Sequence, residues 1–175
     1  RLKTFEARLK GSLNINGPMA SVFNPGAINV NIGGDFISSS ISTNPYAALV
    51  GQVLRFNGDK ISQSFENNST NNASYIFLRN LEINNSNNDG IVSYSGNKQL
   101  VVYDDLIINS ELNLNNQFLV LWKSLYNHNV YSSSGGQGYI LFNNTSNQYI
   151  YGSDNAEFGN IRIRAGKSVI SEISF

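Results

Sequence analysis

Hydrophobic residues occur along this chain in short runs that Asn, Ser, Asp or Gly interrupt every few positions. Residues 77–122 show this most clearly, because none of their apolar runs is long enough to develop the 3.6-residue period of a helix. Apolar residues alternate strictly with Asn at 13–15 and 28–32, which puts one face of a strand inside and the other in water. Turn sequences such as Asn-Pro-Gly at 24–26 separate the runs. The pattern predicts an all-β chain of many short strands.

The strands repeat with a regular offset. Residues 80–84 (Asn-Leu-Glu-Ile-Asn) align with residues 105–109 (Asp-Leu-Ile-Ile-Asn) at an offset of 25. One turn of a parallel β-solenoid needs about this many residues when it holds a few strands joined by turns. Two-residue hairpin turns, which an antiparallel sheet would use, are scarce. We therefore predict a right-handed parallel β-helix of about seven rungs, with an antiparallel β-sandwich as the alternative.

A longer similarity indicates modules. The phrase Phe-Asn-Gly, then Gln, then Asn-Leu-Glu-Ile within residues 56–83 corresponds to Phe-Asn-Asn, then Gln, then Asn-Ile-Arg-Ile within residues 142–163. The first copy is six residues longer, the length of the Asn-rich stretch 67–72, which we interpret as an inserted loop. The predicted division, within one continuous solenoid, is the end of a module at 1–50, a full module at 51–137 and the start of another at 138–175.

The last strand is predicted at residues 169–175, with no polar cap after it. A solenoid end without a cap offers unpaired backbone groups to another chain. We expect this strand to pair with a continuation of the same polypeptide or with a partner. Its apolar side chains are Val169, Ile170, Ile173 and Phe175.

Composition limits the partners. Charged residues make up 14% of the chain, the net charge is zero and Lys and Arg do not cluster, so we expect no nucleic acid and no anionic membrane as a partner. The absence of Cys excludes a disulfide framework, a thiolate metal site and a cysteine nucleophile. No apolar run approaches 18 residues, so we expect no membrane insertion, and residues 1–8 lack the apolar core of a signal peptide. The 28 Asn residues are expected to form hydrogen-bonded ladders on successive rungs.

The most suggestive candidates for catalysis are the adjacent acids Asp104 and Asp105. Two carboxylates held close together can share acid and base roles, but adjacent residues of a strand point to opposite faces. With Arg162 and Arg164 they faintly resemble two motifs of the pectin-hydrolysing β-helix glycosidases, whose Asn-Thr-Asp and Gly-His-Gly motifs are missing here. We interpret the pair as solvated acids beside a turn and expect no enzymatic activity.

Metal and cofactor motifs are sparse. His128 is the sole histidine and has no second ligand at a suitable spacing, and the glycine-rich segment 132–138 lacks the lysine and helix of a phosphate cradle. Asp89, and Asp154 with Glu157, supply oxygens that suit Ca²⁺ without matching a known calcium loop. We therefore expect no cofactor, and Ca²⁺ is the one ion left open.

Aromatic residues concentrate in the second half of the chain. They would stack on sugar rings if several shared one outer face, or they are the ordinary aromatic stacks of a solenoid, which we favour. The six candidates for contact with a ligand are Trp122, Tyr126, Tyr131, Tyr139, Tyr149 and Tyr151.

Several phrases have the form of known surface-protein repeats. They are Asn-Pro-Gly through Gly-Asp-Phe at 24–36, Phe-Asn-Gly at 56–58, Asn-Leu-Glu-Ile-Asn-Asn-Ser at 80–86, Asp-Leu-Ile-Ile-Asn at 105–109 and Glu-Leu-Asn-Leu at 111–114. Together they resemble the repeat units of very large secreted proteins of Bacteroidetes, over most of residues 9–165. Members of that family are surface adhesins and gliding-associated proteins exported by the type IX secretion system. The resemblance implies an extracellular role at the cell surface and no catalytic residues.

These patterns give three expectations for function. The first is a structural or adhesive segment of a long extracellular protein, whose partners are the rest of its own polypeptide or other secretion and cell-surface proteins. The second is a carbohydrate-binding or polysaccharide-active β-helix protein. The third is a fibre of the phage or tailocin type, which would require a trimer.

Overall fold

The chain folds into three parallel β-sheets. The computed structural model describes residues 6–15, 29–39, 53–68, 76–96, 99–133, 136–154, 156–164 and 166–173. These residues form strands and no helix, and every pairing between them is parallel. None of them belongs to a helix long and apolar enough to cross a membrane.

The sheets are named A, B and C in the order in which the chain reaches them. Sheet A consists of β1 (Glu6–Leu9), β3 (Asn29–Ile32), β5 (Leu54–Phe56), β8 (Leu81–Ile83), β11 (Leu106–Ile108), β14 (Ser124–Asn127), β17 (Gln148–Gly152) and β20 (Val169–Ile173). Sheet B consists of β2 (Leu13–Ile15), β4 (Phe36–Ser38), β6 (Ser62–Asn67), β9 (Ile91–Gly96), β12 (Glu111–Asn113), β15 (Val130–Ser132) and β18 (Glu157–Phe158). Sheet C consists of β7 (Ile76–Leu78), β10 (Leu100–Val102), β13 (Phe118–Leu121), β16 (Tyr139–Phe142) and β19 (Ile161–Ile163).

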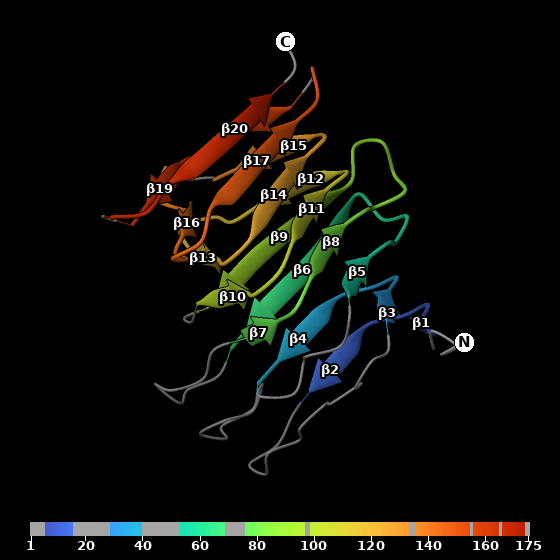
Figure 1. The fold of residues 1–175 in the computed structure, drawn as a ribbon. Coiled ribbons are helices and arrows are strands. Elements are labelled where there is room, and N and C mark those ends of the chain that lie inside the picture. Colours follow the sequence, from blue (N-terminus) through green and yellow to red (C-terminus); the bar gives the residue numbers. More distant parts are fainter. Residues whose placement is uncertain are drawn as a thin grey trace, which may run out of the picture.

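The chain coils forward through these sheets. From β7 onward it passes from C to A to B and then returns to C beside the strand it has just left. Figure 1 shows the resulting stack, which runs from the blue strands at the N-terminal end to the red strands at the C-terminal end. The eight strands of sheet A bound seven turns, so the predicted parallel β-helix of about seven rungs is confirmed and the antiparallel sandwich is wrong.

The predicted 25-residue offset is one turn of this coil. Leu81 pairs with Leu106 one rung further, as the alignment of 80–84 with 105–109 requires. Turn length is not constant, because Leu106 pairs with Leu125 after 19 residues and Leu54 with Leu81 after 27. Corners absorb the difference: residues 84–90 join β8 to β9, whereas only residues 109–110 join β11 to β12. Of the predicted loop at 67–72, only residues 67 and 68 lie within the described part of the chain.

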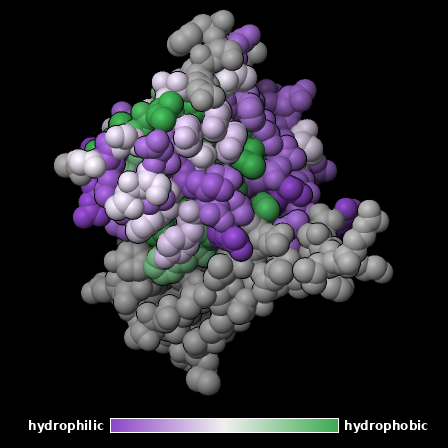
Figure 2. Space-filling model, in the orientation of Figure 1, coloured by the Kyte–Doolittle hydropathy of each residue, from purple (hydrophilic) through white to green (hydrophobic). Residues whose placement is uncertain are grey.

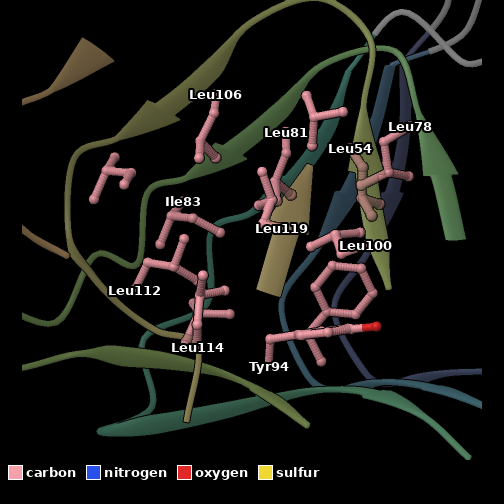
Figure 3. Close-up of a cluster of buried hydrophobic side chains, with 14 of the residues drawn as sticks. Leu54, Leu78, Leu81, Ile83, Tyr94, Leu100, Leu106, Leu112, Leu114 and Leu119 are labelled. Atoms are coloured by element: carbon pink, nitrogen blue, oxygen red, sulfur yellow. The ribbon is translucent and has the colours of Figure 1, made fainter. Parts of the chain in front are cut away.

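The core is a set of stacked apolar rows inside the coil. In sheet A one such row contains Leu54, Leu81 and Leu106, all 5% exposed or less, and Figure 3 shows them with their neighbours from sheets B and C. Alternation within each strand sends every second side chain into these rows. Each core residue packs on the equivalent residue of the next rung. The size of side chain that fits at a core position therefore depends on the neighbouring rungs as much as on its own strand.

Two glutamines close corners of the coil, and we call them the corner glutamines, Gln63 and Gln148. Both are completely buried. Gln63 Oε1 accepts a hydrogen bond from the backbone N–H of Gly58 at 3.2 Å. Its Nε2 donates to the carbonyl oxygens of Ile32 at 3.2 Å and Gly34 at 2.7 Å, on the preceding rung.

Gln148 repeats this arrangement. Its Oε1 accepts from the N–H of Asn144 at 2.8 Å, and its Nε2 donates to the carbonyl oxygens of Leu121 at 2.9 Å and Lys123 at 3.2 Å. A buried amide thus satisfies backbone groups where the chain turns and ladder pairing is interrupted.

The similarity between residues 56–83 and 142–163 is therefore a repeated corner. Gln63 follows a corner from sheet A to sheet B, whereas Gln148 follows a corner from sheet C to sheet A. The two copies share local geometry on different sides of the coil. The module boundaries at 50/51 and 137/138 stay a prediction.

We predict that replacing either corner glutamine by leucine destabilises the chain strongly. Gln63→Leu leaves the Gly34 carbonyl and the Gly58 N–H buried without partners, while the Ile32 carbonyl keeps its bond from the Asn57 N–H. At about 1–3 kcal/mol for each of the two groups, we expect the free energy of unfolding to fall by at least about 2 kcal/mol. Gln148→Leu should do the same. Urea unfolding followed by circular dichroism measures the change.

The exposed Gln137 is the matched control, and its replacement by leucine should alter the free energy of unfolding by less than about 0.5 kcal/mol. Equal stabilities for the two corner variants and the control would contradict this role of the corner glutamines.

Candidate functional site

The acids Asp104 and Asp105 lie at the corner between β10 and β11, and each faces a different cation. Arg79 Nε, one rung earlier, is 2.7 Å from Asp104 Oδ2, whereas Lys123 Nζ, one rung later, is 3.5 Å from Asp105 Oδ2. The carboxylates thus belong to ion pairs that run along the corner. They do not face each other across one site, as a carboxylate pair for acid–base catalysis would.

The two arginines that resembled a glycosidase motif lie far from these acids. Arg162 is in β19, and Arg164 follows it. Strand β10, which precedes the acids, is three strand spacings from β19 in sheet C, about 14 Å. The structure therefore does not bring the faint motif together.

The candidate metal ligands are scattered. His128 is exposed at a corner of the coil, and the N–H of Asp89 donates to Asn87 Oδ1 at 3.1 Å within a local turn. Asp154 and Glu157 are both exposed. Within the part of the chain that the structure describes, no three His, Asp or Glu residues lie close enough to hold a metal ion. The absence of a cofactor stays a prediction, and Ca²⁺ stays open.

An open depression follows the corner between sheets A and B in the early rungs. Arg8, Lys10, Asn57 and Asp59 are among the residues that line it. Glycine lets successive turns of the backbone approach closely at this corner, since a Cβ on Gly58 would collide with the carbonyl oxygen of Gly33. The lining of the depression mixes both charges on exposed side chains, and Asp59 is the one acid among the described residues that line it.

The aromatic candidates lie on two different outer faces. Tyr126, Tyr149 and Tyr151 line sheet A, where the rings of Tyr126 and Tyr151 stack with centroids 4.7 Å apart. Trp122 and Tyr139 belong to the outer face of sheet C. Three of the candidates thus share the outer face of sheet A, and two lie on the outer face of sheet C.

Sequence reasoning missed three rings of the sheet C group. Phe77 stacks on Tyr103 with centroids 5.8 Å apart, and Tyr103 contacts Trp122 at 5.9 Å. Phe118 stacks on Tyr139 at 5.0 Å. The alternation along β13 could have identified this face, because residues 118, 120 and 122 alternate with core positions and must all point outward.

Tyr131 corrects one prediction. It was a candidate for ligand contact, but it points inward from β15, is 1% exposed and packs in the core. Its hydroxyl donates to the carbonyl oxygen of Asn160 at 2.8 Å. Burial raises the pKa of Tyr131 above its usual range, because the phenolate would lose its hydration.

The proposed edge strand is β20. Its backbone pairs with β17, and within the described residues no strand pairs with its other side. Val169 packs against the core, whereas Ile170 is 40% exposed. Ile173 ends the strand, and Phe175 lies outside the described residues. Pairing of this strand with another chain stays a prediction.

On the face drawn in Figure 2, hydrophilic residues cover most of the described region and hydrophobic residues appear in small groups. No family model, no curated protein and no solved structure matches this chain. Any function must therefore be inferred from the chain itself.

We predict that Tyr131 makes the fold sensitive to alkali. The native state keeps this phenol neutral while the unfolded chain ionises it near pH 10. The stabilisation is complete below that pH and is lost as pH rises further, at up to about 1.4 kcal/mol per pH unit. Urea unfolding at pH 9 to 12 should show a shallower decline for Tyr131→Phe than for the unmodified chain.

Tyr103, which is 45% exposed, supplies the matched control. Tyr103→Phe should keep the steep alkaline decline. Identical pH profiles for the Tyr131 variant and the unmodified chain would exclude this effect.

Proposed function

We propose that this chain is a non-catalytic structural and adhesive segment of a long extracellular protein at a bacterial surface. The observation that carries the proposal is the unbroken ladder of sheet A, in which eight parallel strands pair in series from β1 to β20. A coil of this kind extends along one axis and lengthens by one strand spacing with each rung. Such a shape suits a spacer that holds a binding surface away from a cell.

The polar surface supports this role. One outward row of sheet B pairs in series from β6 to β15 and consists of Ser64, Ser93, Asn113 and Ser132. Hydroxyl and amide groups keep a long solenoid soluble without charge repulsion between rungs. The natural partners of such a segment are the rest of its own polypeptide and other secretion or cell-surface proteins. Export by the type IX system is the route that the resemblance to Bacteroidetes repeats implies.

A polysaccharide-degrading enzyme is the competing function from another class. It would need acids gathered in one groove, whereas Asp104 and Asp105 are each held by a cation from a different rung. A carbohydrate-binding role without catalysis agrees better with the aromatic rows. A trimeric fibre is the third alternative, and the mass of the particle in solution distinguishes it.

We predict that the segment resists stretching rung by rung. Force applied at the two ends must break the hydrogen bonds between neighbouring strands before a turn is released. Each released turn of 19 to 27 residues should lengthen the chain by about 6 to 9 nm. Single-molecule force spectroscopy measures these steps. A smooth force–extension curve without steps, like that of an unfolded chain, would contradict a spacer role.

The acids are expected to be dispensable for surface behaviour. Asp104→Asn combined with Asp105→Asn removes two exposed ion pairs, each of which contributes about 1 kcal/mol or less to stability. Neither the unmodified chain nor the variant should release reducing ends from polygalacturonate. Cleavage that the double substitution abolishes would establish an enzyme instead.

A further inference from the structure

The outer face of sheet C departs from the polar pattern of the coil. Phe77, Val101, Val120 and Leu141 pair in series on β7, β10, β13 and β16 and point away from the core. Val101 and Val120 are each only 6% exposed, although neither belongs to the core cluster. An apolar layer therefore lies on the outside of the sheet, where sheet B has Ser and Asn.

Aromatic rings flank this row on both sides, and we call the row with these rings the sheet C outer face. Tyr103 and Trp122 lie at the C-terminal ends of β10 and β13, with centroids 5.9 Å apart. Phe118 and Tyr139 lie at the N-terminal ends of β13 and β16, on the same face of the sheet. The valines of the row are buried and the rings around them are partly exposed, so the accessible part of this face is aromatic. Partly exposed Trp and Tyr rings suit contact with a ligand.

The ring ladder stops at Trp122. The outward position one rung further is Asn143, as the pairing of Leu121 with Phe142 fixes. Among the described residues, Tyr103 is the one ring that contacts Trp122, so the other side of the indole has no aromatic neighbour. The row of rings thus ends where Trp122 is followed by the amide of Asn143, and we call this junction the step.

Two arginines stand beside this step. Arg164 Nη1 donates to Asn143 Oδ1 at 2.8 Å, and the Arg162 guanidinium lies 3.9 Å from the ring centroid of Tyr139. Both are exposed, and neither forms an ion pair with a described residue. The other cations at this corner, Arg79 on an earlier rung and Lys123 next to Trp122, are by contrast paired with acids.

We propose that the sheet C outer face binds an acidic polysaccharide. The C–H face of a sugar ring would pack on the partly exposed Trp122, and uronate or sulfate groups would be bound by Arg162 and Arg164. Guanidinium groups recognise such oxyanions through paired hydrogen bonds, and their unneutralised charge complements an anionic chain. This inference rests on the adhesive part of the proposed function and names its ligand class.

The architecture favours a polysaccharide over an acidic peptide. An extended peptide binds a sheet by adding a strand at an edge, but β10, β13 and β16 each pair with a strand on both sides. The face also runs straight along the axis for five strands, about 19 Å. A polymer with a short, regular repeat can follow such a strip without backbone pairing.

The single tryptophan makes the test direct. Trp122 is the sole Trp of the chain, so its fluorescence reports on this face alone. Titration with polygalacturonate at low salt should change the emission in a saturable way, and high salt should weaken the binding because the contacts are ionic. Arg162→Gln combined with Arg164→Gln should weaken binding by about tenfold or more with an unchanged circular dichroism spectrum. Neutral dextran should not bind.

Lys60→Gln is the matched control, because it removes one exposed cation at the corner between sheets A and B and should leave binding unchanged. Absence of any saturable change with polygalacturonate and with chondroitin sulfate would overturn the proposal, as would insensitivity to the double arginine substitution. Equal binding of polyglutamate would assign the face to acidic peptides instead. A chain that shows stepwise extension under force but fails these titrations keeps its proposed spacer role and loses only this ligand.

Discussion

Backbone hydrogen bonds between successive turns are the interaction on which the rest of this structure depends. Each strand of a rung is only two to six residues long, too short to be stable alone, and its N–H and C=O groups are satisfied by the rungs before and after it. Stacking in register then places equivalent residues above one another. The apolar rows inside, the amides at the corners and the ring ladders outside all follow from that register.

The same constraint explains why buried polar residues occur in a core that is otherwise apolar. At a corner the chain leaves the ladder, and its backbone groups lose their regular partners. Gln63 and Gln148 supply replacements from fully buried side chains. Asn127, also fully buried, donates to the carbonyl of Glu157 in a comparable way. Polar residues inside this coil thus mark the places where the strand geometry ends.

The sequence revealed the coil because alternation and the 25-residue offset are local signals that register preserves. It did not reveal which side of the coil a phrase occupies, since the corner of Gln63 and the corner of Gln148 have the same local chemistry in different sheets. Tyr131 was misplaced for a related reason: a lone tyrosine in a short strand does not show which face it takes until its rung neighbours Leu112 and Phe158 are known. The ring ladder at Trp122 joins residues some 20 positions apart, so no single strand displays it.

A coil closed by its own corner glutamines has a consequence for its history. The backbone partners of each corner glutamine lie in its own turn and the turn before, and Gln63 Oε1 accepts one further bond from the side chain of Asn85 on the next turn. Gene duplication or deletion of whole turns would therefore preserve the backbone bonds of a corner glutamine, because a carbonyl or an N–H is present whichever residues the neighbouring turn carries. The length of such a protein can drift by complete turns over evolutionary time, while selection acts separately on the few outward residues that meet other molecules.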